Sequence, residues 1–266
     1  TEQAAIQAEV KKHESDNQLQ LELNRDRLRT SEVIEDINKR LQIELARIVQ
    51  RVRGSMSHAA TWGSIEREKR VSTLLPDFAQ LKQDFIAKKG AEWETEMKRF
   101  QDYLGKMINC KDEARLQFDL DVLLKRFEEG TPFKYHNTSN NSKALVGNKP
   151  DGALVLKEDV VSAISLQAVL EYKIQNEINN THYGQAWNLL RILLECQPWR
   201  QSARCLLITP KQVCVITARI DNRSVQNVFL HARIEIAETL DLSSSNAVLL
   251  IHEFFNQPFV FFGMAI

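Results

Sequence analysis

The chain has 266 residues, 43 % of them hydrophobic and 26 % charged, so it can bury a substantial core. Its 35 Lys and Arg residues balance 35 Asp and Glu residues, which excludes a histone-like polycation and an acidic tail protein but leaves open nucleic-acid binding through a local basic patch. With 9 Gly and 6 Pro, the chain is neither collagen-like nor of low complexity.

Residues 1–108 are predicted to form an all-α, coiled-coil-like region, with one helical segment at 77–108. An apolar stripe with steps of three and four residues favours a long helix before it: Ile34, Ile37, Leu41, Leu45, Ile48 and Val52. Because the surrounding sequence is mostly polar, this helix needs a partner, and we expect a homodimer or a coiled-coil partner. A helical subdomain folded back within one chain is the alternative.

The pattern changes after a third expected helix at 111–128. Residues 130–150 are rich in Gly, Pro, Asn and Ser and predict a loop. Helices are expected beyond it at 182–196 and, as helix or strand, at 246–255, and strands are expected at 153–156, 164–173, 203–209, 213–220 and 228–236. This order predicts an α+β domain over residues 109–266, an α/β/α core around a mixed β-sheet.

Targeting features are few. No apolar run reaches the roughly 18 residues of a membrane-spanning helix, and no basic-then-apolar leader is visible, so we expect no membrane partner. The 4 cysteines lack metal-ligand spacing and lie in mostly apolar sequence. We therefore expect free thiols in a reducing compartment, and an intracellular protein.

The informative constellation is Pro150-Asp151-Gly152, followed twenty residues later by Glu171-Tyr172-Lys173. If the second motif is extended, Glu171 and Lys173 share one face of a strand, while Tyr172 points to the opposite face and the core. Asp151 stands just before the preceding strand. A hairpin of these two strands would bring Asp151 close to Glu171.

Two carboxylates and an ammonium at one strand end suit metal-assisted phosphodiester hydrolysis. Mg²⁺ prefers oxygen ligands and usually takes one or two carboxylates, with water and phosphate completing its shell. The ion activates a water, and a nearby Lys can orient or deprotonate that water. The structural alternatives are an ordinary Pro-Asp-Gly turn and a solvated Glu-x-Lys pair.

The order Pro-Asp … Glu-x-Lys, within helix-strand-strand-helix-strand, resembles the PD-(D/E)xK nuclease superfamily over residues 111–220. The resemblance implies that Asp151 and Glu171 hold Mg²⁺ or Mn²⁺ and that Lys173 positions or activates the attacking water. It also implies an outer metal ligand on the first helix, matched by Glu113. A Gln at the start of the helix after the Lys, matched by Gln185, would orient Lys173 or a phosphate.

A finer resemblance joins three short segments: Gly184-Gln185-Ala186-Trp187-Asn188-Leu189-Leu190, Gln197-Pro198-Trp199-Arg200, and Leu206-Leu207-Ile208-Thr209. Together they look like the nuclease domain of Crinkler-type proteins. That resemblance implies a DNA substrate and a nuclear location. The nucleotide-hydrolysing module that often precedes such nucleases has no counterpart here, because the chain contains no Walker A pattern.

These observations support one main hypothesis, a Mg²⁺-dependent nuclease that hydrolyses nucleic acid, with DNA as the expected substrate. In it, the helical region 1–108 serves dimerisation or partner binding. The alternative is a catalytically inactive module that keeps the nuclease fold and binds DNA or protein, since a fold does not fix a function.

Overall fold

The computed structural model describes residues 58–67, 70–141, 144–145, 147–220 and 232–256. The apolar stripe at 34–52, and the coiled-coil and dimer predictions that depend on it, lie outside the described residues. The described elements are, in order, α2 (His58–Arg67), β1 (Val71–Leu74), α3 (Phe78–Lys89), a 3₁₀ turn (Gly90–Glu92), α4 (Trp93–Met107), α5 (Glu113–Phe127), β2 (Phe133–Asn137), β3 (Gly152–Leu156), β4 (Ala168–Tyr172), α6 (Asn180–Cys196), β5 (Ser202–Ile208), β6 (Gln212–Arg219), β7 (Arg233–Ala237), β8 (Leu240–Asp241) and α7 (Ser245–Asn256).

The strands form one mixed sheet in the order β1-β7-β6-β5-β4-β3-β2, and the short β8 also pairs with β6. Two neighbouring pairs, β1 with β7 and β4 with β5, are parallel. The other pairs are antiparallel. The predicted α+β class with a mixed sheet is therefore confirmed for the described part of the chain.

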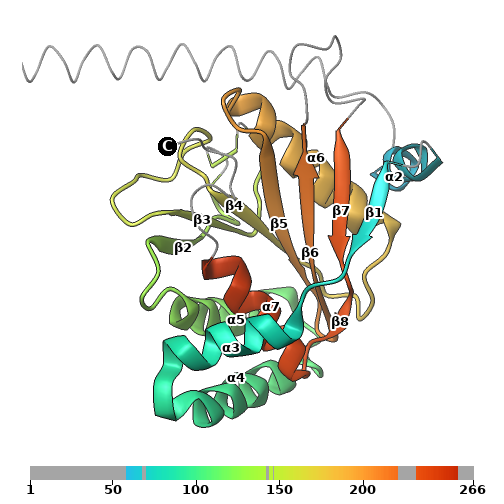
Figure 1. Cartoon of the computed structure of the whole chain (residues 1–266). Coiled ribbons are helices and arrows are strands. Elements are labelled where there is room, and N and C mark those ends of the chain that lie inside the picture. Colours follow the sequence, from blue (N-terminus) through green and yellow to red (C-terminus); the bar gives the residue numbers. More distant parts are fainter. Residues whose placement is uncertain (1–57, 68–69, 142–143, 146, 221–231, 257–266) are drawn as a thin grey trace, which may run out of the picture. The chain divides into compact units, whose positions relative to one another are not determined.

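Helices cover both faces of the sheet (Figure 1). Helix α6 lies on one face, and α3, α4, α5 and α7 gather on the other, where the main apolar core lies. Helix α5 shows how the sequence sets this packing. Its Asp112 side chain caps the first turn by accepting from the Ala114 N–H at 2.9 Å. Its buried side chains recur at helical spacing and form one face: Leu116, Leu120, Leu123, Leu124 and Phe127.

Two short strands lie where other structure was predicted. Residues 71–74, expected within a helical region, form β1, and the β-branched Val71 and Thr73 favour that extended backbone. Residues 133–137, expected within a loop, form β2, whose Phe133 and Tyr135 are buried at alternate positions. Each strand is short enough for the flanking turn residues to dominate the local pattern.

The predicted boundary at 108/109 does not separate two cores. Strand β1 joins the same sheet, and Phe85 of α3 and Phe100 of α4 share one hydrophobic cluster with α5 and α7. The four thiols are free, as predicted, and all but Cys110 are buried. The stretch at 246–255 is a helix, and none of the described helices combines the length and apolar character that a membrane crossing requires.

Candidate functional site

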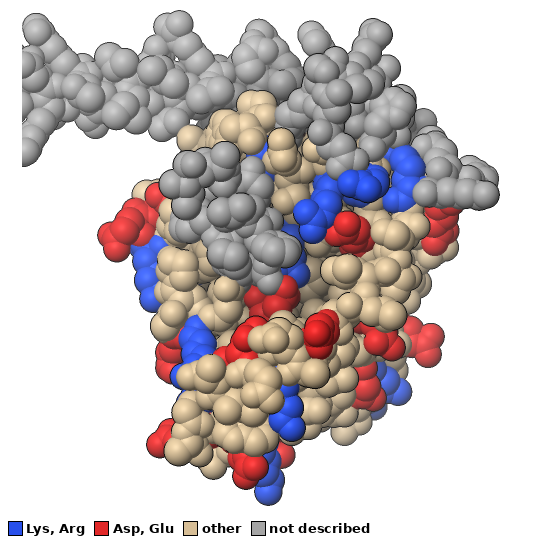
Figure 2. Space-filling model, in the orientation of Figure 1, with Lys and Arg blue, Asp and Glu red and all other residues tan. Residues whose placement is uncertain are grey.

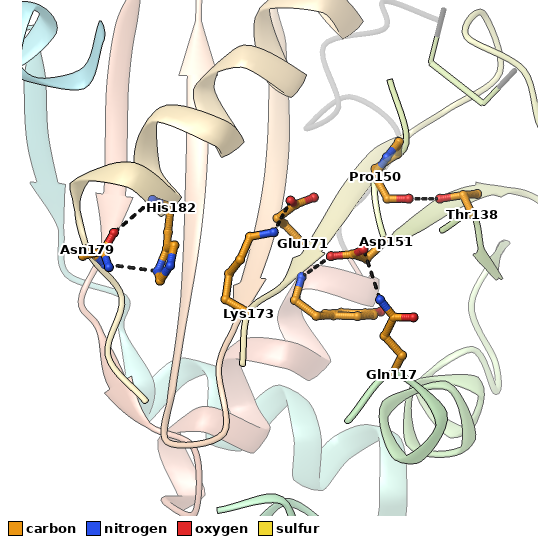
Figure 3. A network of polar contacts seen from close by, with 9 residues as sticks. Gln117, Thr138, Pro150, Asp151, Glu171, Lys173, Asn179 and His182 are labelled. Carbon is orange, nitrogen blue, oxygen red and sulfur yellow. Dashed lines mark hydrogen bonds and ion pairs between the residues drawn. The ribbon is translucent and has the colours of Figure 1, made fainter. Parts of the chain in front are cut away.

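The three residues of the predicted constellation meet at one edge of the sheet (Figure 3). Strands β3 and β4 are antiparallel, with Gly152 opposite Leu170. Asp151 directly precedes β3, so the register places it beside Glu171 of β4. Lys173 follows β4, and its backbone N–H donates to the Ile208 carbonyl of β5 at 2.9 Å. The antiparallel register of β3 and β4, and the pairing of β4 with the parallel strand β5, therefore fix the positions of Asp151, Glu171 and Lys173.

Glu171 and Lys173 form a close ion pair. Lys173 Nζ donates to Glu171 Oε1 at 2.5 Å, and only 17 % of the Lys173 side chain and 10 % of the Glu171 side chain are exposed. Tyr172, between them, points to the opposite face and joins the core, as alternation predicts. The second carboxylate oxygen of Glu171, Oε2, is buried and has no hydrogen-bond partner among the described residues.

Asp151 is held at both of its carboxylate oxygens. Oδ2 accepts from the backbone N–H of Tyr172 at 2.7 Å, and Oδ1 accepts from the side-chain amide of Gln117 at 3.3 Å. Gln117 comes from α5, so a helix and a strand together orient the carboxylate.

The turn before β3 is fixed from a neighbouring loop. The Thr138 hydroxyl donates to the Pro150 carbonyl at 2.6 Å, and the Thr138 N–H donates to the Asp151 carbonyl at 3.0 Å. A Cβ at Gly152 would lie 2.6 Å from Cε2 of Tyr135 and 2.9 Å from the Tyr172 hydroxyl. The glycine of Pro-Asp-Gly is therefore required by close packing beside the site.

Burial sets the protonation of the carboxylates. It raises the pKa of Asp151, against the opposing effect of the Tyr172 N–H hydrogen bond. Burial, together with the charge of Asp151, raises the pKa of Glu171 to about 7. For Lys173, burial acts to lower the pKa, but Glu171 and then Asp151 outweigh it and raise the pKa. At neutral pH, Lys173 is therefore an ammonium next to a carboxyl that titrates.

Neither Glu113 nor Gln185 is seen in contact with the pair of carboxylates among the described residues. Glu113 is the exposed first residue of α5, and its charge contributes to the raised pKa of both Asp151 and Lys173. Among the described residues, no three His, Cys, Asp or Glu side chains are grouped so that they could hold a metal ion. Gln185 lies on α6, and its buried amide oxygen has no hydrogen-bond partner in the described part of the chain.

Two polar residues near the predicted constellation, Gln117 and His182, were not among the predicted site residues. Gln117 lies one helical turn after Glu113, and this i,i+4 spacing could have indicated that both side chains lie on one face of the helix. Gln117 was not predicted because only acidic residues of this helix were considered as site residues. His182 caps α6, with Nδ1 accepting from the Asn179 N–H at 3.3 Å. Burial and then the charge of Lys173 lower the pKa of His182, which places the start of α6 close to the site. Figure 3 shows this helix start and Gln117 on either side of Lys173 in that view.

Comparison with known proteins gives two matches. Residues 122–200 match a family described as a domain of unknown function (DUF6826), a range that includes Asp151, Glu171 and Lys173. A cryo-EM structure of a DrdV–DNA complex is similar with a TM-score of 0.39 and 18 % sequence identity, covering 61 % of this chain and 14 % of that chain. The present chain thus spans a small part of that protein's length. No match is found among curated proteins.

Proposed function

We propose that this protein is a divalent-metal-dependent phosphodiesterase that hydrolyses nucleic acid, with DNA as its substrate. The observation that carries the proposal is the pair of buried carboxylates beside a lysine ammonium, in which Glu171 Oε2 has no partner among the described residues. Leaving a buried charged oxygen unpartnered is costly. A bound cation would remove that cost.

The donor set fits Mg²⁺ or Mn²⁺. Asp151 and Glu171 offer hard oxygen ligands from adjacent strands, and one or two carboxylates are the usual protein contribution to a Mg²⁺ site that also binds a substrate phosphate. When bound, such an ion lowers the pKa of a water and neutralises charge on the phosphate. Glu171, with a pKa of about 7, becomes an ionised ligand at and above neutral pH.

The role of Lys173 follows from its protonation. Its raised pKa keeps the ammonium protonated at neutral pH, so Nζ is a hydrogen-bond donor and a positive charge rather than a base. In hydrolysis, a water gives up a proton to the solvent as its oxygen bonds to phosphorus, the bond to the leaving sugar oxygen breaks, and that oxygen takes up a proton from the solvent. Nζ would orient the water or a phosphate oxygen and stabilise the negative charge that develops.

Binding of nucleic acid must depend on local contacts. The whole chain has no net charge, and Figure 2 shows Lys and Arg side chains interspersed with Asp and Glu on the face in view. We therefore expect modest affinity with a shallow salt dependence, because few phosphates would be neutralised. Self-association through residues 1–108, and an intracellular, nuclear location, stay predictions.

A cleavage assay tests the proposal. The full chain is incubated with end-labelled DNA, or with RNA of the same sequence, in Mg²⁺ or in EDTA. We expect DNA cleavage that requires the metal and is lost in Asp151→Asn. The matched control is Asp159→Asn, an exposed aspartate beyond the opposite end of β3, which should cleave normally.

Two outcomes would contradict the proposal. Full activity in EDTA would reject a metal-dependent reaction, and an Asp151→Asn variant as active as the unaltered protein would reject the site. DNA binding without any cleavage would instead favour the inactive nuclease-fold module.

A further inference from the structure

We infer, building on the proposed function, that Gln117 is a positioning residue that fixes Asp151 and limits the site to a single divalent ion. Gln117 acts through Asp151 and touches neither the ion nor the substrate. The inference depends on the contacts of its amide, on the way α5 is anchored, and on the charges that surround Asp151.

The amide of Gln117 completes the orientation of the carboxylate. A carboxylate can only accept hydrogen bonds, so the Gln117 group facing Asp151 Oδ1 at 3.3 Å is its NH₂. The Tyr172 N–H occupies the other oxygen at 2.7 Å. With one donor on each oxygen, rotation of the carboxylate is restricted, while each oxygen keeps a lone pair for a cation.

Helix α5 is a rigid base for this contact. Leu116 and Leu120, on either side of Gln117, are fully buried in the core. One turn beyond Gln117, Asp121 accepts a hydrogen bond from the Tyr135 hydroxyl and another from the Asn137 amide at 2.6 Å. The helix is thus tied to β2 on the same side as its contact with Asp151, so Gln117 is held at a defined place.

The charge balance then sets the number of ions. Asp151 and Glu171 supply two negative charges, and the ammonium of Lys173 offsets one of them. The exposed Glu113 adds its charge from the start of α5 without joining the group. No third His, Cys, Asp or Glu joins them in a metal-holding group among the residues that the structure describes. In two-ion sites the cations lie about 3.5–4 Å apart, and their mutual repulsion is about four times that of two unit charges at that distance. A neutral Gln117 contributes nothing against this repulsion, so one ion is the capacity of the site.

Two substitutions at Gln117 separate its two roles. In Gln117→Leu the amide is lost, and we expect one Mn²⁺ to bind about tenfold more weakly, the usual minimum for an outer-shell partner. In Gln117→Glu a third carboxylate of the same shape is added, and we expect a second Mn²⁺ to bind. Binding is measured by calorimetric titration of Mn²⁺ into the full chain without nucleic acid.

The matched control is Gln80→Leu. Gln80 is an exposed helical glutamine whose amide also donates to an aspartate, Asp84, at 2.8 Å. This variant should bind one Mn²⁺ with an affinity within about twofold of the unaltered protein. Thermal melts accompany each titration, and Gln117→Met, which keeps an unbranched side chain, replaces the Leu variant if that variant melts early.

The outcomes distinguish this inference from the proposed function. Two ions in the unaltered protein, or one ion in Gln117→Glu, would overturn the single-ion limit. An unchanged affinity in Gln117→Leu or Gln117→Met would overturn the positioning role. Each of these results leaves the proposed function standing, whereas an unaltered protein that binds no Mn²⁺ would overturn the proposed function itself.

Discussion

The two ends of β4 both bury polar side chains, but they use them differently. At the beginning of the strand, Arg200 is fully buried and donates to the carbonyls of Gln167 at 2.6 Å and Leu166 at 3.0 Å. Gln197 beside it donates to the Leu166 carbonyl at 2.8 Å. At the other end, buried Glu171 accepts from Lys173 at 2.5 Å, and its second oxygen has no partner among the described residues.

The difference separates a structural cluster from a candidate site. Burial lowers the pKa of Arg200 to about 9, but its charge is directed at backbone oxygens that need donors, so the cluster holds the chain before β4 in place. Glu171 offers an acceptor that the described chain does not use. A buried charge alone therefore does not indicate function, and an unused acceptor alone does not either, since Gln197 Oε1 and Glu195 Oε2 are also buried without a partner among the described residues. Glu171 differs because it is clustered with a second carboxylate, Asp151, and with Lys173.

The largest expected difference between the two ends is in activity. Glu171→Gln removes a proposed metal ligand with little change in volume, and we expect cleavage to fall by about a thousandfold or more, the equivalent of several kcal/mol. Glu158→Gln, an exposed glutamate just beyond β3, is the control and should retain full activity. Single-turnover cleavage rates give the comparison, and equal rates for the two variants would remove Glu171 from the site.

Arg200→Met is expected to affect stability instead. It leaves the Leu166 and Gln167 carbonyls without their guanidinium donor, and we expect the free energy of unfolding to fall by about 3 kcal/mol. Arg115→Met, at an exposed arginine paired with Asp119, should cost about 0.5 kcal/mol or less. Urea denaturation measures both. A folded Arg200→Met with unchanged stability but weaker Mn²⁺ binding would show that the comparison is wrong.

Gly152→Ala tests the packing that supports the site. The added methyl group would collide with Tyr135 and Tyr172, two buried rings whose hydroxyls are 2.9 Å apart. Overpacking of this kind costs about 1–3 kcal/mol, so the melting temperature should drop by several degrees. Gly63→Ala is the control, since a Cβ at Gly63 has no neighbour within 4 Å. Equal melting temperatures for the two variants would mean that Gly152 is not required.

The smallest expected effect is a pH dependence. Because the pKa of Glu171 is raised from 4.5 to about 7, the folded state holds this proton more tightly than the unfolded chain does. Its stabilising contribution is complete below pH 4.5 and is lost as the pH rises through 7. In EDTA, we expect Glu171→Gln to gain about 1–2 kcal/mol relative to the unaltered protein between pH 5.5 and 7. Parallel stability curves for the two proteins would contradict the raised pKa.

Much of the site was predictable because strand periodicity and hairpin register are local properties of the sequence. The alternation at Glu171 and Lys173, and the approach of Asp151, follow from strands that are each a few residues long. The contact of Gln117 was not predictable in the same way, since it depends on how α5 packs against the sheet. The oxygen of Glu171 that has no partner among the described residues is likewise a result of three-dimensional packing.

The fold likewise contains elements that were predictable from the local sequence and elements that were not. The apolar stretches at 153–156 and 182–196 predicted β3 and α6, because long or strongly apolar segments dominate their local pattern. Strand β1 was missed because Val71–Leu74 pairs with β7, which is far along the chain. Strand β2 was missed because the turn residues that flank Phe133–Asn137 dominate the local pattern, although its partner β3 is the next strand. Partners that are far apart in sequence leave little local trace.

The most direct test of the account is the position of a bound ion. Crystals of the full chain soaked in Mn²⁺ would be examined by anomalous diffraction at the manganese edge. We predict one peak at the sheet edge, with oxygens of both Asp151 and Glu171 at about 2.1–2.2 Å, near the distances of octahedral Mg²⁺ sites. An edge without a peak, with Glu171 still paired with Lys173, would contradict the assignment of this edge as a metal site.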